Sequence, residues 1–141
     1  MALSTSPLSI LVADDEPGLA EAIADLLQLD GHVVITSRDG LEACAVVPKV
    51  PFHLVLSDLS MPGMPGDELL VALRERNGPA FWFVLMSSAV EWSIKSRLHA
   101  ADGYLQKPLR PHELDALVRA CAAAPEIAAR LRDPPGERDA A

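Results

Sequence analysis

The segment that decides the fold reads FHLVLSDLSMPG and runs from Phe52 to Gly63. Its first half is an apolar run, which predicts a buried strand, and that strand ends in the carboxylate of Asp58. A buried strand that brings an acid to its own C-terminal tip positions a reactive group and does not merely fill a core. The prolines and glycines that follow predict a loop at that tip.

Apolar runs alternate with amphipathic runs along the whole chain. The expected strands are Ser9–Ala13, Val33–Ser37, Phe52–Asp58, Phe81–Ser87 and Gly103–Gln106. The expected helices are Gly18–Leu29, Gly40–Val47, Asp67–Glu75, Glu91–Ala101 and Pro111–Ala123, and the sequence after Pro125 is compatible with a short helix over Glu126–Arg132. Apolar, unalternating strands separated by helices predict an α/β fold, in which a doubly wound parallel sheet of five strands carries helices on both faces.

Polar side chains gather at the predicted strand ends. Asp14 and Asp15 follow the first strand, Asp58 and Ser87 end the third and fourth, and Lys107 follows the fifth. In open parallel sheets, ligands bind outside the carboxyl ends of the strands, near the point where the strand order reverses. We therefore expect these five residues to form one charged pocket.

The three acids predict a metal site. Carboxylates that share a pocket repel one another, and a divalent cation removes that cost. Oxygen ligands with room for water favour Mg²⁺ over zinc. Asp14, Asp15 and Asp58 are the candidate ligands, and the backbone carbonyl of Ser60 is a further one.

The same pocket suits phosphoryl transfer. A carboxylate beside Mg²⁺ can act as a nucleophile toward phosphorus, which makes Asp58 the candidate nucleophile. The transferred group carries spreading negative charge, which Lys107 can neutralise. The hydroxyl of Ser87 can donate a hydrogen bond to a further phosphoryl oxygen.

The chain resembles the receiver domain of bacterial two-component response regulators. The resemblance covers roughly Leu8 to Ala123, and it rests on four pieces in the order and spacing of that family. They are LVADDE (Leu11–Glu16), SDLSMPGMPG (Ser57–Gly66), VLMSSA (Val84–Ala89) and ADGYLQKPL (Ala101–Leu109). The resemblance implies a flavodoxin-like sheet with strand order 2-1-3-4-5, an order that the sequence pattern alone does not give.

The resemblance also implies a role for each matching residue. Asp58 would accept the phosphoryl group from a histidine kinase or a phosphotransfer protein. Asp14 and Asp15 would hold Mg²⁺, and Lys107 would bind the phosphoryl group through its side chain. The peptide bond between Lys107 and Pro108 is expected to be cis.

Two further residues would transmit the signal. Ser87 is the favoured switch hydroxyl, although the neighbouring Ser88 stays an alternative, and Tyr104 would be the switch aromatic that swings inward with it. The family's output face consists of the helix over 91–101, the strand over 103–106 and the helix over 111–123. A downstream protein would bind there, and the receiver would be a monomer or a phosphorylation-dependent dimer.

The interval from Asp58 to Lys107 is a few residues shorter than is usual in that family. The missing length falls around Glu91–Ala101, so we expect a remodelled output face, with Trp92 exposed or covering a shortened helix. The predicted receiver domain spans residues 8–124, with flexible tails at 1–7 and 125–141. No helix-turn-helix fits after residue 124, so the expectation is a stand-alone receiver or one cut from a longer protein.

Composition narrows the classes of partner. The 141 residues contain 12 Lys+Arg and 20 Asp+Glu, a net charge of −8, which disfavours direct contact with nucleic acid or an anionic membrane. Cys44 and Cys121 are far apart and predict free, buried thiols, as expected of a reducing cytoplasm. No signal peptide and no apolar run near the roughly 18 residues of a membrane span are present in the sequence.

There are two alternatives to a phosphorylated receiver. An aspartyl-phosphate phosphatase needs a second acid two residues after its nucleophile, and Ser60 stands there, so we expect no enzyme activity beyond self-phosphorylation and self-dephosphorylation. A degenerate receiver would bind proteins without phosphorylation, which the complete acid, hydroxyl and lysine set argues against. The four histidines, His32, His53, His99 and His112, show no metal-binding spacing and are expected to have no functional role.

Overall fold

The computed structural model describes residues 6–77, 81–88 and 101–132. Its strands are β1 (Ser9–Ala13), β2 (Val33–Ser37), β3 (Leu54–Asp58), β4 (Trp82–Ser87) and β5 (Gly103–Gln106). Its helices are α1 (Pro17–Leu29), α2 (Gly40–Val46), α3 (Gly66–Asn77), α5 (Pro111–Ala123) and α6 (Pro125–Arg132), with a short 3₁₀ helix over Val47–Lys49. The expected helix over 91–101, and Trp92 with it, lies outside the described residues apart from Ala101.

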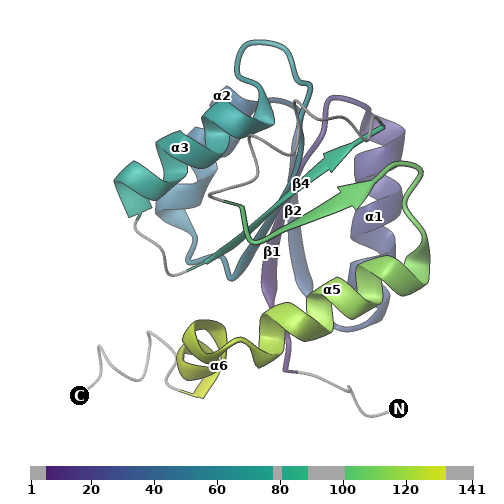
Figure 1. Cartoon of the computed structure of the whole chain (residues 1–141), viewed down its shortest axis with the longest axis vertical. Helices are drawn as coiled ribbons and strands as arrows, with labels where there is room; N and C mark the ends of the chain where they lie inside the picture. The colour runs from purple at the N-terminus through teal and green to yellow at the C-terminus, as the bar shows by residue number, and fades with distance from the viewer. Residues whose placement is uncertain (1–5, 78–80, 89–100, 133–141) are drawn as a thin grey trace.

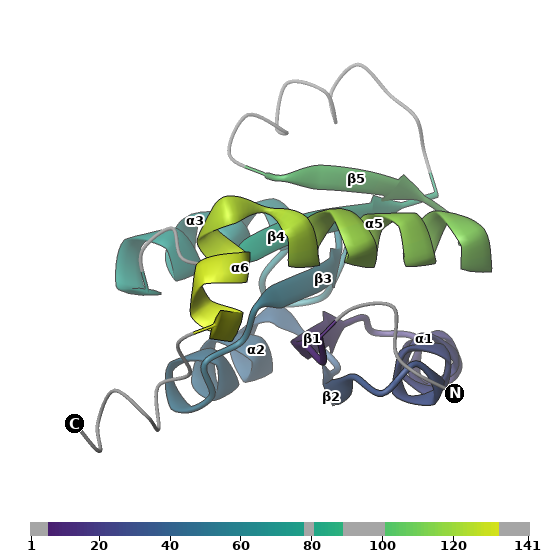
Figure 2. The same ribbon diagram turned by 90° about the horizontal axis from the view of Figure 1, so that it is seen from below.

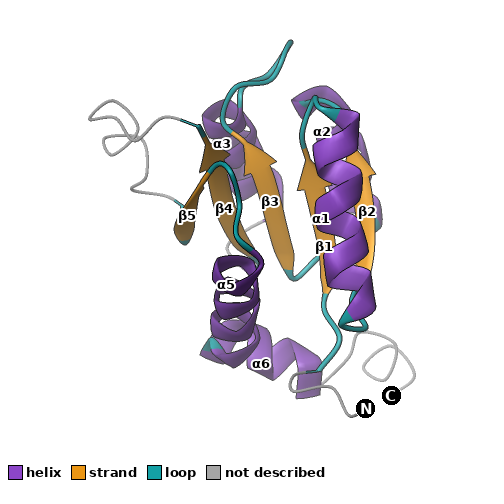
Figure 3. Ribbon diagram, turned by 90° about the vertical axis from the view of Figure 1, so that its right-hand side faces the viewer, coloured by secondary structure: helices purple, strands orange, loops and turns teal. Residues whose placement is uncertain are grey.

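The strands form one parallel sheet in the order β2-β1-β3-β4-β5. This confirms the predicted α/β class, the parallel arrangement and the flavodoxin-like order. Figure 1 shows the strands in the middle of the molecule with the helices around them. Helices α1 and α5 cover one face, and α2 and α3 cover the other, as Figure 3 shows with α1 and α5 toward the viewer. Strand order reverses between β1 and β3, which is where such sheets bind ligands.

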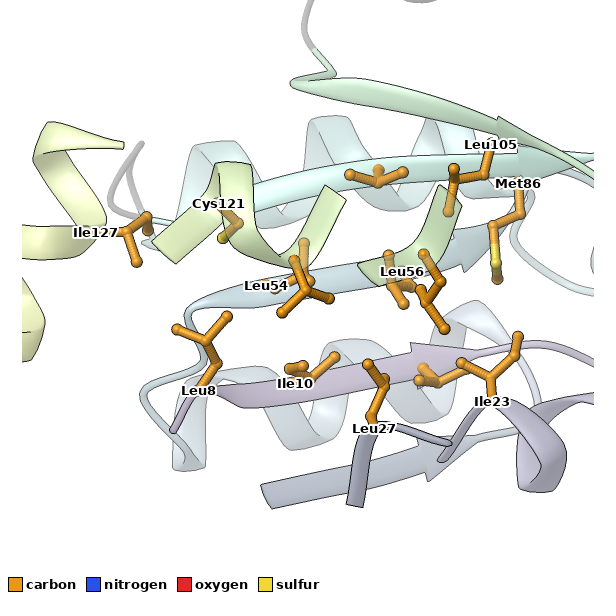
Figure 4. Packing of buried hydrophobic residues seen from close by; sticks show 14 of the residues in the cluster. Leu8, Ile10, Ile23, Leu27, Leu54, Leu56, Met86, Leu105, Cys121 and Ile127 are labelled. Carbon is orange, nitrogen blue, oxygen red and sulfur yellow. The ribbon is translucent and has the colours of Figure 1, made fainter. Parts of the chain in front are cut away.

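Alternate residues of each strand supply two separate cores. In β1, Ile10 and Val12 join the core under α1 and α5, whereas Leu11 and Ala13 join the core under α2 and α3. The central strands are buried on both faces, which explains why their sequences read as continuous apolar runs. Figure 4 shows the first of these cores, in which side chains of β1 and β3 pack with side chains of α1 and α5.

Several element boundaries differ from the sequence prediction by one or two residues, and two of these differences have a clear local reason. The helix predicted to reach Val47 ends at Val46, and the chain continues as the 3₁₀ turn that contains Pro48. Proline lacks an N–H and cannot continue an α-helix. The third strand begins at Leu54 and not at Phe52, because the N–H of Phe52 donates to the carbonyl of Val50 in a turn and not to the sheet.

The prediction of a flexible tail from residue 125 is wrong for residues 125–132, which form helix α6. Ala124 has extended backbone, as expected of a residue before proline, so α6 leaves α5 in a new direction (Figure 2). The side chain of Ile127 is fully buried, and the indole N–H of Trp82 donates to Glu126 Oε1 at 2.9 Å. These contacts make α6 part of the packed fold. Within the described ranges, the helices are all too short or too polar to cross a bilayer.

Candidate functional site

The predicted site residues meet at one edge of the sheet. Asp14 directly follows β1, Asp58 ends β3, Ser87 ends β4 and Lys107 directly follows β5. Because all the strands are parallel, their carboxyl ends lie at the same edge (Figure 3). The chain therefore brings together residues that are up to 93 positions apart in sequence, Asp14 and Lys107 among them.

Three carboxylates form a cluster at this edge. Asp14, Asp15 and Asp58 each offer one oxygen, and these oxygens lie within 4.8 Å of one another. Asp14 and Asp58 are buried, with 0% and 6% of their surface exposed, while Asp15 is exposed to solvent. An all-oxygen donor set that is open on one side fits Mg²⁺, which keeps several waters when it binds to proteins.

Lys107 reaches into the acid cluster. Its Nζ lies 2.9 Å from Oδ2 of Asp14 and 3.2 Å from Oδ2 of Asp58. Burial and the charge of Asp14 raise the pKa of Asp58, while the charge of Lys107 and the N–H of Ser60 oppose that rise. Burial lowers the pKa of Lys107, but the hydrogen bond to Asp14 and the charges of both acids outweigh it, so the net pKa of Lys107 is raised. At neutral pH the lysine is therefore a fixed cation.

The loop after Asp58 packs closely on the backbone of that residue. The N–H of Ser60 lies 3.3 Å from Oδ1 of Asp58, and the N–H of Gly66 donates to the carbonyl of Leu59 at 2.8 Å. A Cβ at Gly66 would collide with the carbonyl oxygen of Asp58. Gly66 thus allows α3 to begin directly against the acid. The role of the Ser60 carbonyl as a metal ligand stays a prediction.

The two candidate switch hydroxyls differ in burial. Ser87 is 7% exposed at the end of β4, whereas Ser88 is exposed in the turn that follows. The N–H of Lys107 donates to the carbonyl of Ser87 at 2.7 Å, which ties the lysine to the same strand end. Tyr104 is half-buried against the core under α2 and α3. The peptide bond between Lys107 and Pro108 is cis, as the resemblance implied.

Two features were missed from the sequence, one in the site itself and one at the opposite edge of the sheet. Glu16 brings a further carboxylate to 4.0 Å from Lys107 Nζ, and the quoted LVADDE piece contains the signal for it. Arg74 of α3 pairs with Asp102 at 2.6 Å, and Asp102 also accepts the N–H of Phe83. This clamp fixes the start of β5 against β4 and α3. The only sign of this ion pair in the sequence is Asp102, an acid directly before the predicted strand over 103–106.

Comparisons with known proteins agree with this geometry. The sequence profile described as the response regulator receiver domain matches residues 10–119. The chain is 34% identical over 118 residues to the DNA-binding response regulator MtrA of Mycolicibacterium smegmatis. That match covers 84% of this chain and 52% of MtrA, so the chain spans about half the length of that relative.

Solved structures give the same fold. The chemotaxis protein CheY4 of Vibrio cholerae superposes with a TM-score of 0.77 at 28% identity, covering 82% of this chain and 99% of CheY4. The response regulator TrrA of Thermotoga maritima, solved in complex with Mg²⁺ and BeF, gives a TM-score of 0.74 at 29% identity. That alignment covers 81% of this chain and 98% of TrrA.

Proposed function

This chain belongs to the response regulator receiver domain family, and from this premise we propose that it is a signalling receiver controlled by phosphorylation of Asp58. The observation that supports the proposal most directly is the position of Asp58. It ends a central strand, shares a cluster with two further acids and lies 3.2 Å from the half-buried Lys107. The phosphoryl donor is a histidine kinase or a phosphotransfer protein.

The proposed transfer is a displacement at phosphorus. A carboxylate oxygen of Asp58 forms a bond to the phosphorus of a phosphohistidine, the P–N bond breaks, and the donor's imidazole leaves. Asp58 must be ionised to attack, and the charge of Lys107 together with the N–H of Ser60 favours that state. Asp14, Asp15 and Asp58 would hold Mg²⁺, which supplies positive charge to the phosphoryl oxygens.

Lys107 has a second role once the phosphoryl group is in place. Its ammonium already lies beside Oδ2 of Asp58, so a phosphoryl group on that residue would bring new acceptor oxygens within its reach. The hydroxyl of Ser87, buried at the neighbouring strand end, would move to donate to one of these oxygens. Tyr104 would follow into the space that Ser87 leaves, which changes the surface formed by β5 and α5. The downstream partner is a protein that reads this surface.

The test is a mass measurement with a small phosphodonor. Incubation with acetyl phosphate and Mg²⁺ should add the mass of one phosphoryl group to the intact protein. The addition should disappear in Asp58→Asn and persist in Asp25→Asn, which alters an exposed acid of α1. Failure of the wild-type protein to gain mass under conditions that label a known receiver would contradict the proposal and support a degenerate receiver.

A further inference from the structure

The clamp of Arg74 and Asp102 holds the amino end of β5, at the edge of the sheet opposite to the acid cluster. Nη2 of Arg74 lies 2.6 Å from Oδ2 of Asp102, and the two side chains are only 21% and 30% exposed. Nη1 of the same guanidinium donates to the carbonyl of Phe81 at 2.6 Å, and its Cζ lies 4.5 Å from the centre of the Phe81 ring. Arg74 is therefore fixed by three separate contacts.

Asp102 also extends the hydrogen bonding between β4 and β5. Its Oδ2 accepts the N–H of Phe83 at 2.8 Å, and its own N–H donates to the carbonyl of Phe83 at 2.8 Å. The regular pairing of the two strands begins one residue later, with Val84 opposite Gly103. The carboxylate of Asp102 therefore takes the place of a backbone carbonyl at the start of β5.

This attachment matters because β5 is short and lies at the end of the strand order. It contains four residues and follows β4 at the outer side of the sheet (Figure 3). Strands in such a position open locally more easily than central strands. The far end of β5 is held by the N–H of Lys107, which donates to the carbonyl of Ser87 at 2.7 Å. Tyr104 lies between the two attachments, opposite Leu85 and two residues after Asp102.

Helix α3 links the clamp to the proposed phosphorylation site. It begins at Gly66, where a Cβ would collide with the carbonyl oxygen of Asp58. Arg74 follows eight residues later, which is about 12 Å along a regular helix. One rigid element therefore contacts the backbone of Asp58 near its start and the amino end of β5 near its end. The start of β5 is thus held in a fixed position relative to Asp58.

We propose that Arg74 and Asp102 are positioning residues of the phosphorylation switch, which hold β5 so that a change at Ser87 is converted into a movement of the Tyr104 ring. With the start of β5 fixed, the strand cannot follow Ser87 by shifting along β4, and the adjustment falls on the side chain of Tyr104. Without the clamp, the start of β5 opens instead, and part of the response is lost before it reaches the ring. This inference rests on the proposed function, because it takes phosphorylation of Asp58 and the inward movement of Tyr104 from it.

The test measures phosphorylation and switching separately in the full chain. Intact mass after incubation with acetyl phosphate and Mg²⁺ reports phosphorylation of Asp58. The ¹⁹F signal of 3-fluorotyrosine at Tyr104 reports switching on addition of beryllofluoride and Mg²⁺. We expect Arg74→Met and Asp102→Asn to gain the same mass as the wild type, because the clamp lies away from the acid cluster. The change in ¹⁹F shift between the two states should fall about twofold or more in both variants.

Further variants separate the clamp from general stability. Ile127→Val removes one carbon from the core on the other face of the sheet from α3, so it lowers stability without touching the clamp. It should keep the full ¹⁹F response. Arg74→Lys keeps the charge but lacks the planar fork that bonds Asp102 and the Phe81 carbonyl together. It should give an intermediate response, and it carries the test if a more drastic variant does not fold.

Three results would overturn the inference and leave the proposed function intact. The first is a full ¹⁹F response in folded Arg74→Met and Asp102→Asn, or in Arg74→Lys where those do not fold. The second is a reduced response in Ile127→Val, since the loss would then follow stability in general. The third is a loss of the mass gain in the clamp variants, which would place their effect at Asp58 itself. If the wild type gains no mass with acetyl phosphate, the proposed function is wrong and the inference falls with it.

Discussion

The ammonium nitrogen of Lys107 lies 2.9 Å from Oδ2 of Asp14, a residue with no exposed surface. The same ammonium lies 3.2 Å from Asp58, so one lysine compensates two buried acids. An acid buried without such a partner would cost several kcal/mol of stability. The residue proposed to grip the phosphoryl group therefore also holds the site together before any phosphate arrives.

Replacement of Lys107 by methionine should destabilise the protein, because it leaves Asp14 and Asp58 without their cation. We expect the free energy of unfolding to fall by about 2–3 kcal/mol without Mg²⁺, since removal of one partner of a buried pair is costly. Added Mg²⁺ should recover part of this loss. Urea denaturation measures both values.

The control for this change is Arg119→Met. Arg119 pairs with Asp115 at 2.9 Å, but about half of each side chain is exposed to solvent. We expect a loss below about 1 kcal/mol and no response to Mg²⁺, because exposed ion pairs contribute little. Equal losses in the two variants would mean that Lys107 does not stabilise the acid cluster.

Replacement of Gly66 by alanine should distort the site through the backbone. The added Cβ would meet the carbonyl oxygen of Asp58 and the side chain of Leu85. Overpacking of this kind costs about 1–3 kcal/mol, and it should also slow phosphorylation by acetyl phosphate. Gly18→Ala is the matched control, since nothing lies within 4 Å of a Cβ there and alanine favours helix α1. Equal stability of the two variants would refute the close-contact argument.

The switch can be followed at a single residue, because Tyr104 is the only tyrosine in the chain. Incorporation of 3-fluorotyrosine gives one ¹⁹F signal, which beryllofluoride and Mg²⁺ should shift if the ring moves inward. Ser87→Ala should reduce the shift, since the buried hydroxyl is the proposed donor. Ser88→Ala, at the exposed neighbour, should leave it unchanged. The reverse pattern would assign the switch to Ser88.

A structural feature can be predicted from the sequence when the residues that cause it are close together in the chain. The strand that ends in Asp58 was predicted because full burial leaves a continuous apolar run in the sequence. The docking of α6 was missed because its partners, Pro51, Phe52 and Trp82, are distant in sequence and carry no local signal. The clamp between Arg74 and Asp102 was missed for the same reason.

The histidines show the same limit of prediction from the sequence. His32 and His53 were expected to have no role, yet their Nδ1 atoms accept the N–H groups of Leu8 and Ser9, from the two sides of the start of β1. Only the pairing of β1 with both β2 and β3 brings these groups together. Sequence spacing could exclude a metal site but could not reveal this structural role.

Truncation of Ile127 to alanine tests whether α6 belongs to the fold. Ile127 is fully buried in the core that α1 and α5 cover. We expect the free energy of unfolding to fall by about 2–4 kcal/mol, as for other large-to-small changes in a core. Leu29→Ala is the control, because that side chain is 82% exposed and should cost little. If residues 125–132 were a flexible tail, the two variants would instead have similar stability in urea denaturation.

The last prediction concerns pH and rests on His53. Burial and then the charge of Arg130 lower the pKa of His53 from 6.5 to about 4 in the folded protein. Between these two values the unfolded chain binds more protons than the folded one, so stability falls as pH falls from about 6.5 toward 4. Allowing for the partial exposure of the ring, we expect His53 to account for a loss of about 1–2 kcal/mol between pH 7.5 and 5.0.

His53→Asn isolates this contribution, because asparagine offers an acceptor to the Ser9 N–H and does not titrate. Groups that titrate in both proteins, His32 and Asp58 among them, cancel when the two pH dependences are subtracted. The variant should therefore lose less stability than the wild type between pH 7.5 and 5.0 in urea denaturation. His112→Asn, on the exposed surface of α5, should behave as the wild type. Identical pH dependence in all three proteins would show that His53 is not held neutral by the fold.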